Sequence, residues 1–342
     1  MKFFRLMSLA ALSIGLMSAT QAHEHHEIVV MNAWARATVS AEAGTQGGKM
    51  SGHSHGSGHG HGDVGKVSAA YMTIRNDGDH SMTLISASTP LAGKVEIHES
   101  KMEGDVMRMA QLAEGLTITE GETVELKPGG FHIMLMDLQV DLVEGTAIPL
   151  ELVFSMGEGL EPMSVMIGAA VLIDAPEASP LEITQGWVRP TALKEQAQSS
   201  HGHGGHGHSH GGHSHGSGMG HGHGSGDMSS VTAAYMTITN TGDKPVRIVS
   251  ASAEAAKVGL TEIHETIMQG DVMRMNELAE GLLIDPGQTV ELKPGGLHIM
   301  LMELQAPLME GEAIALTLSL DDGSIVVLGL PIYDKMALEH NH

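Results

Sequence analysis

The sequence predicts an all-β protein built from two tandem domains, and three observations lead to this fold class. A chain of 342 residues suits two domains of ordinary size better than one. A long segment occurs twice, because residues 98–150 align without a gap on residues 264–316, with 37 identities in 53 positions. Apolar residues also recur in short runs between turn sequences, which is typical of β-strands.

The repeat predicts the domain organisation. Aromatic residues repeat along with the long segment, since Trp34 and Tyr71 reappear as Trp187 and Tyr235. A repeat unit of this length indicates tandem domains and not a solenoid. We expect two homologous domains, over residues 27–174 and 179–336, joined by a polar, Pro-containing linker.

The sequence of each unit predicts a series of short strands. The runs AAYMTI, VELKPGGFHIMLM and AIPLELVF are apolar or alternate between apolar and polar residues. Turn sequences separate them, such as residues 76–79, 128–130 and 144–145. Many short strands in about 120 ordered residues predict a β-sandwich or a small barrel.

The first 22 residues have the layout of an export signal. Lys2 and Arg5 precede an apolar run over residues 6–17, and small residues follow up to Ala22. A membrane anchor is the alternative, but this apolar run is short for crossing a bilayer. We expect cleavage after Ala22 and a soluble periplasmic protein that does not insert into the membrane.

Composition excludes several function classes. Lys and Arg number 18 against 41 acidic residues, and a net charge of −23 disfavours nucleic acid and anionic lipid surfaces. The absence of Cys excludes disulfides, thiolate zinc sites, Cys nucleophiles, acylated Cys and blue-copper centres. The sequence contains no Ser-His-Asp frame, phosphate-binding Gly loop or HExxH motif, so we expect no enzyme.

Histidine is concentrated in two low-complexity inserts, at about 40–66 and about 194–228. Gly and Ser make up most of the rest, so we expect these loops to be disordered without a ligand. A flexible polar linker is the alternative, but thirteen His exceed linker composition and predict additional Cu(II) or Zn(II) binding. Their histidines are His53, His55, His59, His61, His201, His203, His206, His208, His210, His213, His215, His221 and His223. After signal cleavage, the N-terminal His23-Glu24-His25 would offer a further Cu(II) chelate.

Four residues in each domain form the candidate metal site. They are His98, Met109, His132 and Met134, repeated as His264, Met275, His298 and Met300. Residues two apart in a strand share a face, which places His132 beside Met134 and opposite Ile133. Two imidazoles and two thioethers make a soft ligand set that selects Cu(I).

Core packing is the alternative for the methionines, because Met on a strand face usually fills a hydrophobic core. The repeated frame favours ligation for the four residues taken together. Further methionines remain open between ligation and packing, and Met107 could substitute for Met109. These are Met102, Met107 and Met136, with their copies Met268, Met273 and Met302.

The frame His98-x10-Met109-x22-His132-x-Met134 resembles that of the periplasmic copper chaperones of the PCuAC family. Their motif is His, ten residues, Met, about twenty-one residues, and His-x-Met. The resemblance covers most of both domains, including the Trp near each start and the AAYM strand. It implies a cupredoxin-like Greek-key β-sandwich that holds one Cu(I) per domain and delivers it toward the copper centre of cytochrome c oxidase. The duplication and the His-rich inserts depart from this pattern.

These residues are compatible with three functions. The favoured one is an exported copper chaperone with two Cu(I) sites, whose partner is a copper-receiving protein of the oxidase assembly pathway. The alternative is a periplasmic copper or zinc storage protein that confers metal tolerance, which the His-rich inserts favour. A copper oxidase or a monooxygenase with an N-terminal His ligand fits poorly with an aromatic content of 3%.

Overall fold

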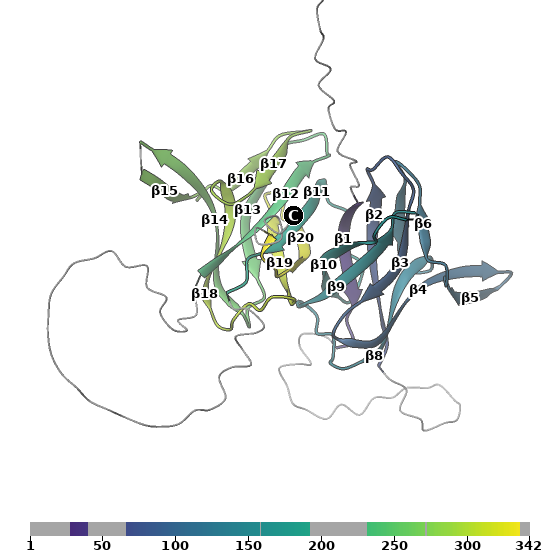
Figure 1. The fold of residues 1–342 in the computed structure, drawn as a ribbon. Helices are drawn as coiled ribbons and strands as arrows, with labels where there is room; N and C mark the ends of the chain where they lie inside the picture. Colours follow the sequence, from purple (N-terminus) through teal and green to yellow (C-terminus); the bar gives the residue numbers. More distant parts are fainter. Residues whose placement is uncertain (1–27, 40–65, 158, 192–230, 271, 336–342) are drawn as a thin grey trace, which may run out of the picture.

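Two similar β-sandwiches make up the described part of the chain (Figure 1). The computed structural model describes residues 28–39, 66–157, 159–191, 231–270 and 272–335. The expected signal peptide, the His23-Glu24-His25 chelate and the His-rich inserts, apart from residue 66, lie outside these residues. Within the described ranges no helix has the length and apolarity needed to cross a bilayer.

Each sandwich contains ten strands, and the two sets correspond one to one along the chain. The first domain consists of β1 (Ile28–Arg36), β2 (Ser68–Asn76), β3 (Met82–Ser88), β4 (Ala92–Glu103), β5 (Val106–Gln111), β6 (Leu116–Ile118), β7 (Thr123–Leu126), β8 (Phe131–Leu138), β9 (Ala147–Ser155) and β10 (Met163–Leu172). The second consists of β11 (Leu181–Val188), β12 (Val231–Asn240), β13 (Val246–Ala253), β14 (Val258–Gln269), β15 (Val272–Glu277), β16 (Leu282–Ile284), β17 (Thr289–Leu292), β18 (Leu297–Leu304), β19 (Ala313–Leu320) and β20 (Ile325–Pro331).

Two sheets face each other in each domain. In the first domain β1-β2-β7-β8-β4-β5 form one layer and β6, β3, β9 and β10 form the other, and parallel pairing of β1 with β10 joins the two layers at one edge. The second domain repeats the two layers with β11-β12-β17-β18-β14-β15 facing β16, β13, β19 and β20. Because β3 leaves the sheet of its chain neighbours β2 and β4, the connections cross between sheets in Greek-key fashion. The predicted fold class, two tandem cupredoxin-like Greek-key β-sandwiches, is confirmed.

The alternation of core-facing and outward-facing residues along the strands shows where each hydrophobic core lies. On β8, Ile133 and Leu135 are fully buried in the core between the sheets, whereas His132 and Met134 point to the other side. Some methionines do fill the core, as the low aromatic content leads one to expect. Met72 is buried among aliphatic residues, and Met82 is 1% exposed.

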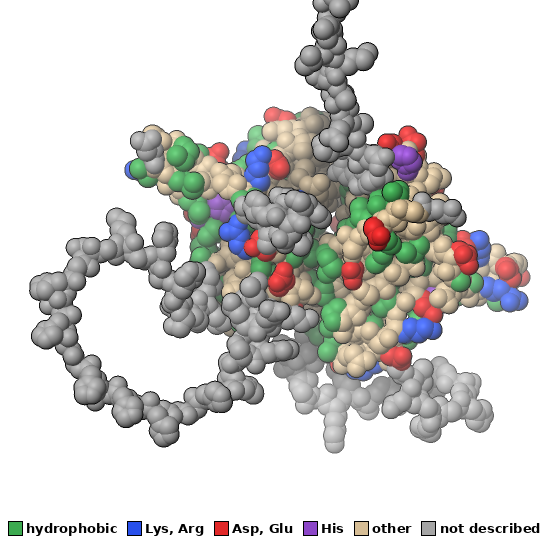
Figure 2. Space-filling model, in the orientation of Figure 1, with side chains coloured by type: hydrophobic (Ala, Val, Ile, Leu, Met, Phe, Trp, Pro, Cys, Tyr) green, Lys and Arg blue, Asp and Glu red, His purple; other side chains and the backbone are tan. Residues whose placement is uncertain are grey.

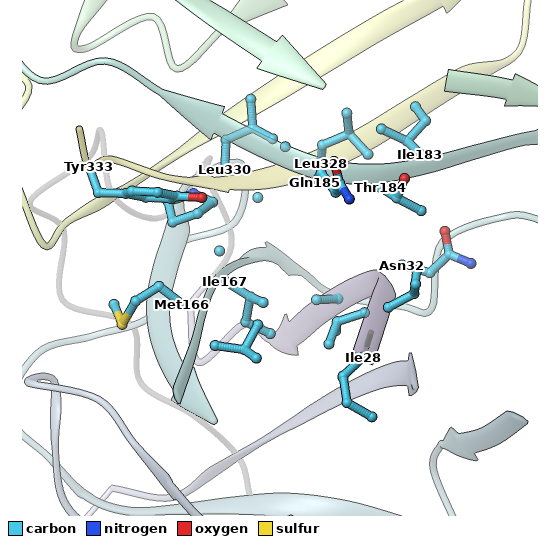
Figure 3. Close-up of a pocket in the computed structure, with 18 of the residues that line it drawn as sticks. Ile28, Asn32, Met166, Ile167, Ile183, Thr184, Gln185, Leu328, Leu330 and Tyr333 are labelled. Atoms are coloured by element: carbon cyan, nitrogen blue, oxygen red, sulfur yellow. The ribbon is translucent and has the colours of Figure 1, made fainter. Parts of the chain in front are cut away.

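The two domains meet where β10 and β20 cross. These strands pair in antiparallel fashion at Gly168 and Gly329, and a Cβ on Gly168 would lie only 2.6 Å from the carbonyl carbon of Gly329. Arg75 of the first domain also donates to the carboxylate of Glu182 in the second, at 3.1 Å. A cavity of ≈240 Å³ lies beside the crossing, between side chains of both domains (Figure 3).

Glu254, at the end of β13, provides a pH-dependent element of stability. Its side chain is 13% exposed, Oε2 accepts no hydrogen bond, and its nearest cation, Lys257, is 3.8 Å away and equally close to Glu312. Burial raises the pKa of Glu254, Lys257 lowers it, and Glu312 raises it again. The folded state therefore holds the proton more tightly than the unfolded state, so stability falls as pH rises through the raised pKa.

Replacing this carboxylate is expected to stabilise the second domain. Glu254→Gln should raise the free energy of unfolding at pH 7 by on the order of 1 kcal/mol, since it removes a charge without its own hydrogen-bond partner. The difference from the parent should shrink as pH falls toward 4.5, the ordinary pKa of a glutamate. Thermal unfolding across this range measures both effects, with the exposed Glu120→Gln as control. An equal or lower stability of Glu254→Gln at pH 7 would contradict the expectation.

Candidate metal centre

Two histidines lie side by side on the face of the first domain that points away from the core. His98 on β4 and His132 on β8 are direct partners in the antiparallel register, and their ring centroids are 5.8 Å apart. His132 is 4% exposed and the His98 side chain 13%. Strand pairing therefore brings together two residues that are 34 positions apart in the sequence.

Hydrogen bonds orient both rings. Nδ1 of His132 donates to the carbonyl of Gly130 at 3.0 Å, and a carbonyl only accepts, so the lone pair of the neutral ring is at Nε2. Nε2 of His98 donates to the carboxylate of Glu96 at 2.8 Å, which leaves its lone pair at Nδ1. Both lone-pair nitrogens are buried and have no hydrogen-bond partner. A fixed outer hydrogen bond with a free inner nitrogen is the usual state of a metal-binding histidine.

Glu96 is held as a carboxylate in this arrangement. The hydrogen bond from Lys94, at 2.6 Å, and that from His98 lower the pKa of Glu96, while burial opposes them. Its two oxygens are thus engaged by neighbours on its own strand. Within the described ranges, no three His, Asp or Glu side chains are grouped as a metal site. The other soft donors on the face of the histidine pair are thioethers.

Both predicted methionines share the face of the histidines. Met134 is two residues from His132 on β8 and lies opposite Glu96. Met109 on β5 lies opposite Ser100, which is two residues from His98 on β4. Since opposed residues and residues two apart point to one side of a sheet, the register places the four predicted residues on one face. Met109 is 53% exposed, so core packing does not explain its presence.

The second domain repeats the arrangement. The rings of His264 and His298 are 5.9 Å apart, with His264 Nε2 bonded to Glu262 and His298 Nδ1 to the carbonyl of Gly296. Nδ1 of His264 is buried and has no hydrogen-bond partner. An open cleft of ≈410 Å³ is lined by His298, Met300 and Met275 together.

Burial keeps the central histidine of the second domain in its ligating form. Desolvation lowers the pKa of His298, the hydrogen bond to Gly296 raises it, and the proximity of His264 lowers it again. A neutral imidazole is the form that binds a metal ion.

A pair of aromatic rings lies beside the histidines of each site, a position that the sequence analysis does not predict. The rings of Trp34 and Tyr71 are 4.6 Å apart, and Tyr71 lies 6.4 Å from the ring of His132. In the second domain Trp187 and Tyr235 repeat this pair, and Met300 packs against them. The repetition of Trp34 and Tyr71 in the sequence was the available signal.

The carboxylate partners Glu96 and Glu262 were missed as well. Their signal is the repeated Glu-Ile-His triplet, in which the Glu stands two residues before the His and on the same face. The two glycines whose carbonyls accept from His132 and His298 also repeat, within the PGG turn.

Removing Glu96 tests its orienting role. In a chain whose second site is disabled by Met275→Leu/Met300→Leu, Glu96→Ala is expected to weaken Cu(I) binding by about 10- to 100-fold, as deletion of such outer partners usually does. Glu96→Gln, which keeps an acceptor oxygen, should weaken it less. Glu99→Ala is the matched control, because Glu99 is on the opposite face of β4. Anaerobic competition with a Cu(I) chelator measures the affinity, and equal affinities for Glu96→Ala and Glu99→Ala would contradict this role.

Sequence comparison places the chain in a family. Residues 28–165 and 181–332 match the family described as "Putative lipoprotein LpqE-like", so both sandwiches are matched and the matches span most of the chain. The chain belongs to the LpqE-like family. Among similar proteins of this LpqE-like chain is a "putative lipoprotein" of Leifsonia xyli subsp. xyli, 38% identical over 114 residues, which are 33% of this chain and 68% of that protein. A protein of Rickettsia prowazekii is 32% identical over 103 residues, 30% of this chain and 56% of that protein.

Solved structures similar to the LpqE-like chain include single domains. The apo PCuAC domain from PmoF1 is 20% identical, with 46% of this chain and 96% of that chain covered and a TM-score of 0.30. The copper-bound PCuAC domain from PmoF2 is 21% identical, with 43% and 93% covered and a TM-score of 0.28. The structure of CuI-DR1885 from Deinococcus radiodurans is 31% identical, with 31% and 70% covered and a TM-score of 0.26.

Proposed function

We propose that this LpqE-like protein is an exported copper chaperone that binds one Cu(I) in each domain. The observation that carries the proposal is the histidine pair of each domain, hydrogen-bonded on the outer nitrogens and, in the first domain, unpartnered on both inner ones. Met109 and Met134, with Met275 and Met300 in the second domain, supply the thioethers on the same face. A ligand set of two imidazoles and two thioethers favours Cu(I) over Zn(II), Ca(II) or Mg(II).

The partial exposure of the site fits a cargo that is passed on. His132 and His298 are buried and the side chains of His98 and His264 are 13% exposed, whereas Met109 and Met275 are about half exposed, at 53% and 52%. An acceptor protein could thus approach the copper from the methionine side and exchange ligands one at a time. The resemblance of the His98-x10-Met109 frame to PCuAC chaperones points to the copper centre of cytochrome c oxidase as the destination. Export to the periplasm agrees with the signal layout of residues 1–22 and with the lipoprotein description of the Leifsonia relative.

Copper transfer tests this function directly. The protein loaded with two equivalents of Cu(I) should transfer copper to the apo copper-binding fragment of cytochrome c oxidase. The visible absorption of the binuclear centre, which develops once an oxidising equivalent is supplied, measures this transfer. The chain with Met109→Leu, Met134→Leu, Met275→Leu and Met300→Leu should not transfer copper from its cores. Retention of copper by the parent protein in the presence of excess acceptor would overturn the chaperone proposal.

Storage is the second candidate, and the thirteen histidines of the two inserts favour it. A storage protein would hold metal well beyond two equivalents and release it only as the free concentration falls. Deletion of residues 198–224 should lower the total Cu(II) or Zn(II) capacity and leave both core sites intact. Metal stoichiometry and transfer rate therefore separate the two candidates.

A further inference from the structure

The hairpin formed by β4 and β5 extends beyond its sandwich. β4 pairs with β8 only up to Glu99, and the rest of the strand pairs with β5 alone. In the second domain β14 pairs with β18 only up to Glu265 and continues as a ribbon with β15. Each domain therefore carries a two-stranded arm that projects away from the rest of the molecule (Figure 1).

A methionine pair stands near the tip of each arm. Met102 is the direct cross-strand partner of Met107, and Met268 is that of Met273. These four side chains are 57–65% exposed, more than any other methionine among the described residues. Hydrophobic side chains are visible on the β14–β15 arm in Figure 2. None of these methionines belongs to a hydrophobic core formed by the described residues, so core packing does not account for an apolar pair at this position.

The pair shares one side of the arm with the inner site. Met102 is four residues from His98 on β4, and Met107 is two residues from Met109 on β5, so all four point to the same face. With a rise of about 3.3 Å per residue, thioethers follow one another along this face in steps of roughly 7 Å from the tip toward His98. The opposite face repeats only in part, since Arg108 corresponds to Arg274 but Lys101 corresponds to Ile267.

Cross-strand geometry suits one soft ion between the paired thioethers. Directly opposed residues have Cβ atoms about 4.5–5.5 Å apart, and methionine has three rotatable side-chain bonds, so both sulfur atoms can reach one ion. Thioethers select soft ions such as Cu(I) and carry no proton that competes with the metal. Two thioethers on an exposed ribbon bind more weakly than the buried set of two imidazoles and two thioethers.

We propose that Met102 with Met107, and Met268 with Met273, form an outer soft-metal subsite on each arm, through which Cu(I) passes to and from the inner site by way of Met109 or Met275. The ligand class is a soft monovalent cation, Cu(I) or its redox-inert surrogate Ag(I). This proposal rests on the proposed function, because an outer subsite needs an inner site to load.

Methionine-methyl NMR tests the subsite in the full chain. With [ε-13C]methionine labelling, resonances are assigned through single Met→Leu variants, and Ag(I) is added stepwise. The methyls of Met109 and Met134 should move first and saturate. The methyls of Met102 and Met107 should then move together at higher Ag(I), while that of Met166, exposed on β10, stays in place. Met102→Leu/Met107→Leu should keep the inner response and slow its loading at least several-fold in stopped-flow Cu(I) transfer.

The possible results distinguish failure of the outer subsite from failure of the proposed function on which it rests. Tip methyls that stay unmoved in excess Ag(I), while the inner methyls shift, would overturn the outer subsite and leave the inner sites standing. Loading of Met102→Leu/Met107→Leu at the parent rate would overturn it as well. Inner methyls that never respond would overturn the proposed function, and the outer subsite with it.

Discussion

Replacing Met109 and Met134 with leucine should remove one of the two tightly held Cu(I) ions and leave the fold nearly intact. Both thioethers on the face of His98 and His132 are lost, and a leucine offers no donor atom. Methionine and leucine have similar volumes, so the cost in stability should stay below about 1.5 kcal/mol. Native mass spectrometry under anaerobic conditions counts the ions, and the second domain serves as an internal reference.

A matched pair of substitutions controls for the loss of methionine itself. Met72 and Met82 are buried in the core of the same domain, at 2% and 1% exposure, and neither lies on the face of the histidines. Met72→Leu/Met82→Leu should therefore keep both Cu(I) ions. If Met109→Leu/Met134→Leu also keeps two ions at unchanged affinity, the assignment of these ligands is wrong.

Gly168→Ala should separate the two domains without unfolding either. The added Cβ would lie 2.6 Å from backbone atoms of both Gly329 and Leu330, and backbone cannot rotate away as a side chain can. β10 and β20 must therefore move apart, at a cost of roughly 1–3 kcal/mol, as is typical of overpacking. The cavity between Ile167 and Leu330 should open (Figure 3). Small-angle X-ray scattering should show a larger radius of gyration, with two Cu(I) ions still bound.

Arg75→Gln provides the comparison for this variant. This substitution removes the ion pair with Glu182 but places no new atom between the strands. The side chains of Arg75 and Glu182 are 29% and 28% exposed. Such a partly solvated pair contributes little, about 1 kcal/mol or less, so the domains should keep their arrangement. Identical scattering curves for Gly168→Ala and the parent would show that the glycine crossing does not hold the domains together.

Much of the fold follows from patterns that the sequence shows directly. Period-two alternation on β8 predicts that Ile133 and Leu135 face the core while His132 and Met134 face away, and the burial of these strands agrees. The gap-free repeat predicts two equivalent domains, and the two sandwiches match strand for strand. Alternation works here because one face of each strand must be buried, which fixes the register.

Other features depend on contacts between residues far apart in the chain. The register of β1 and β2 shifts between Met31 and Trp34, at Asn32 with a positive φ of 53°, and this bulge brings Trp34 opposite Tyr71. Asn tolerates this conformation better than most residues, but Gln185 adopts it at the equivalent bulge of the second domain with a φ of 52°, so residue type alone does not predict the bulge. The same holds for Gly168 and Gly329, which occupy equivalent places in the two domains and meet only when both domains are folded.

The sequence predicts which donor residues form the candidate site but not how their side chains are oriented. The spacing of His98, Met109, His132 and Met134 names the soft ligands, and β-strand geometry places His132 beside Met134. Which ring nitrogen is free depends on hydrogen bonds to Glu96 and to the carbonyl of Gly130. Each partner stands two residues before its histidine, but the sequence alone does not show that these bonds form. The exposed position of the β4–β5 arm also depends on where β8 begins, because Phe131, its first residue, pairs with Glu99.

A Cu(I) titration tests whether each domain holds one tightly bound ion at its histidine pair. The mature chain is titrated with Cu(I) without oxygen in the presence of a competing chelator, and bound ions are counted by native mass spectrometry. We expect two tightly held Cu(I) ions per chain, which persist when residues 198–224 are deleted. They should drop to none when His98, His132, His264 and His298 are all replaced by alanine in a folded protein. Tight Cu(I) binding that disappears with the deletion, or survives the four replacements, would contradict this expectation.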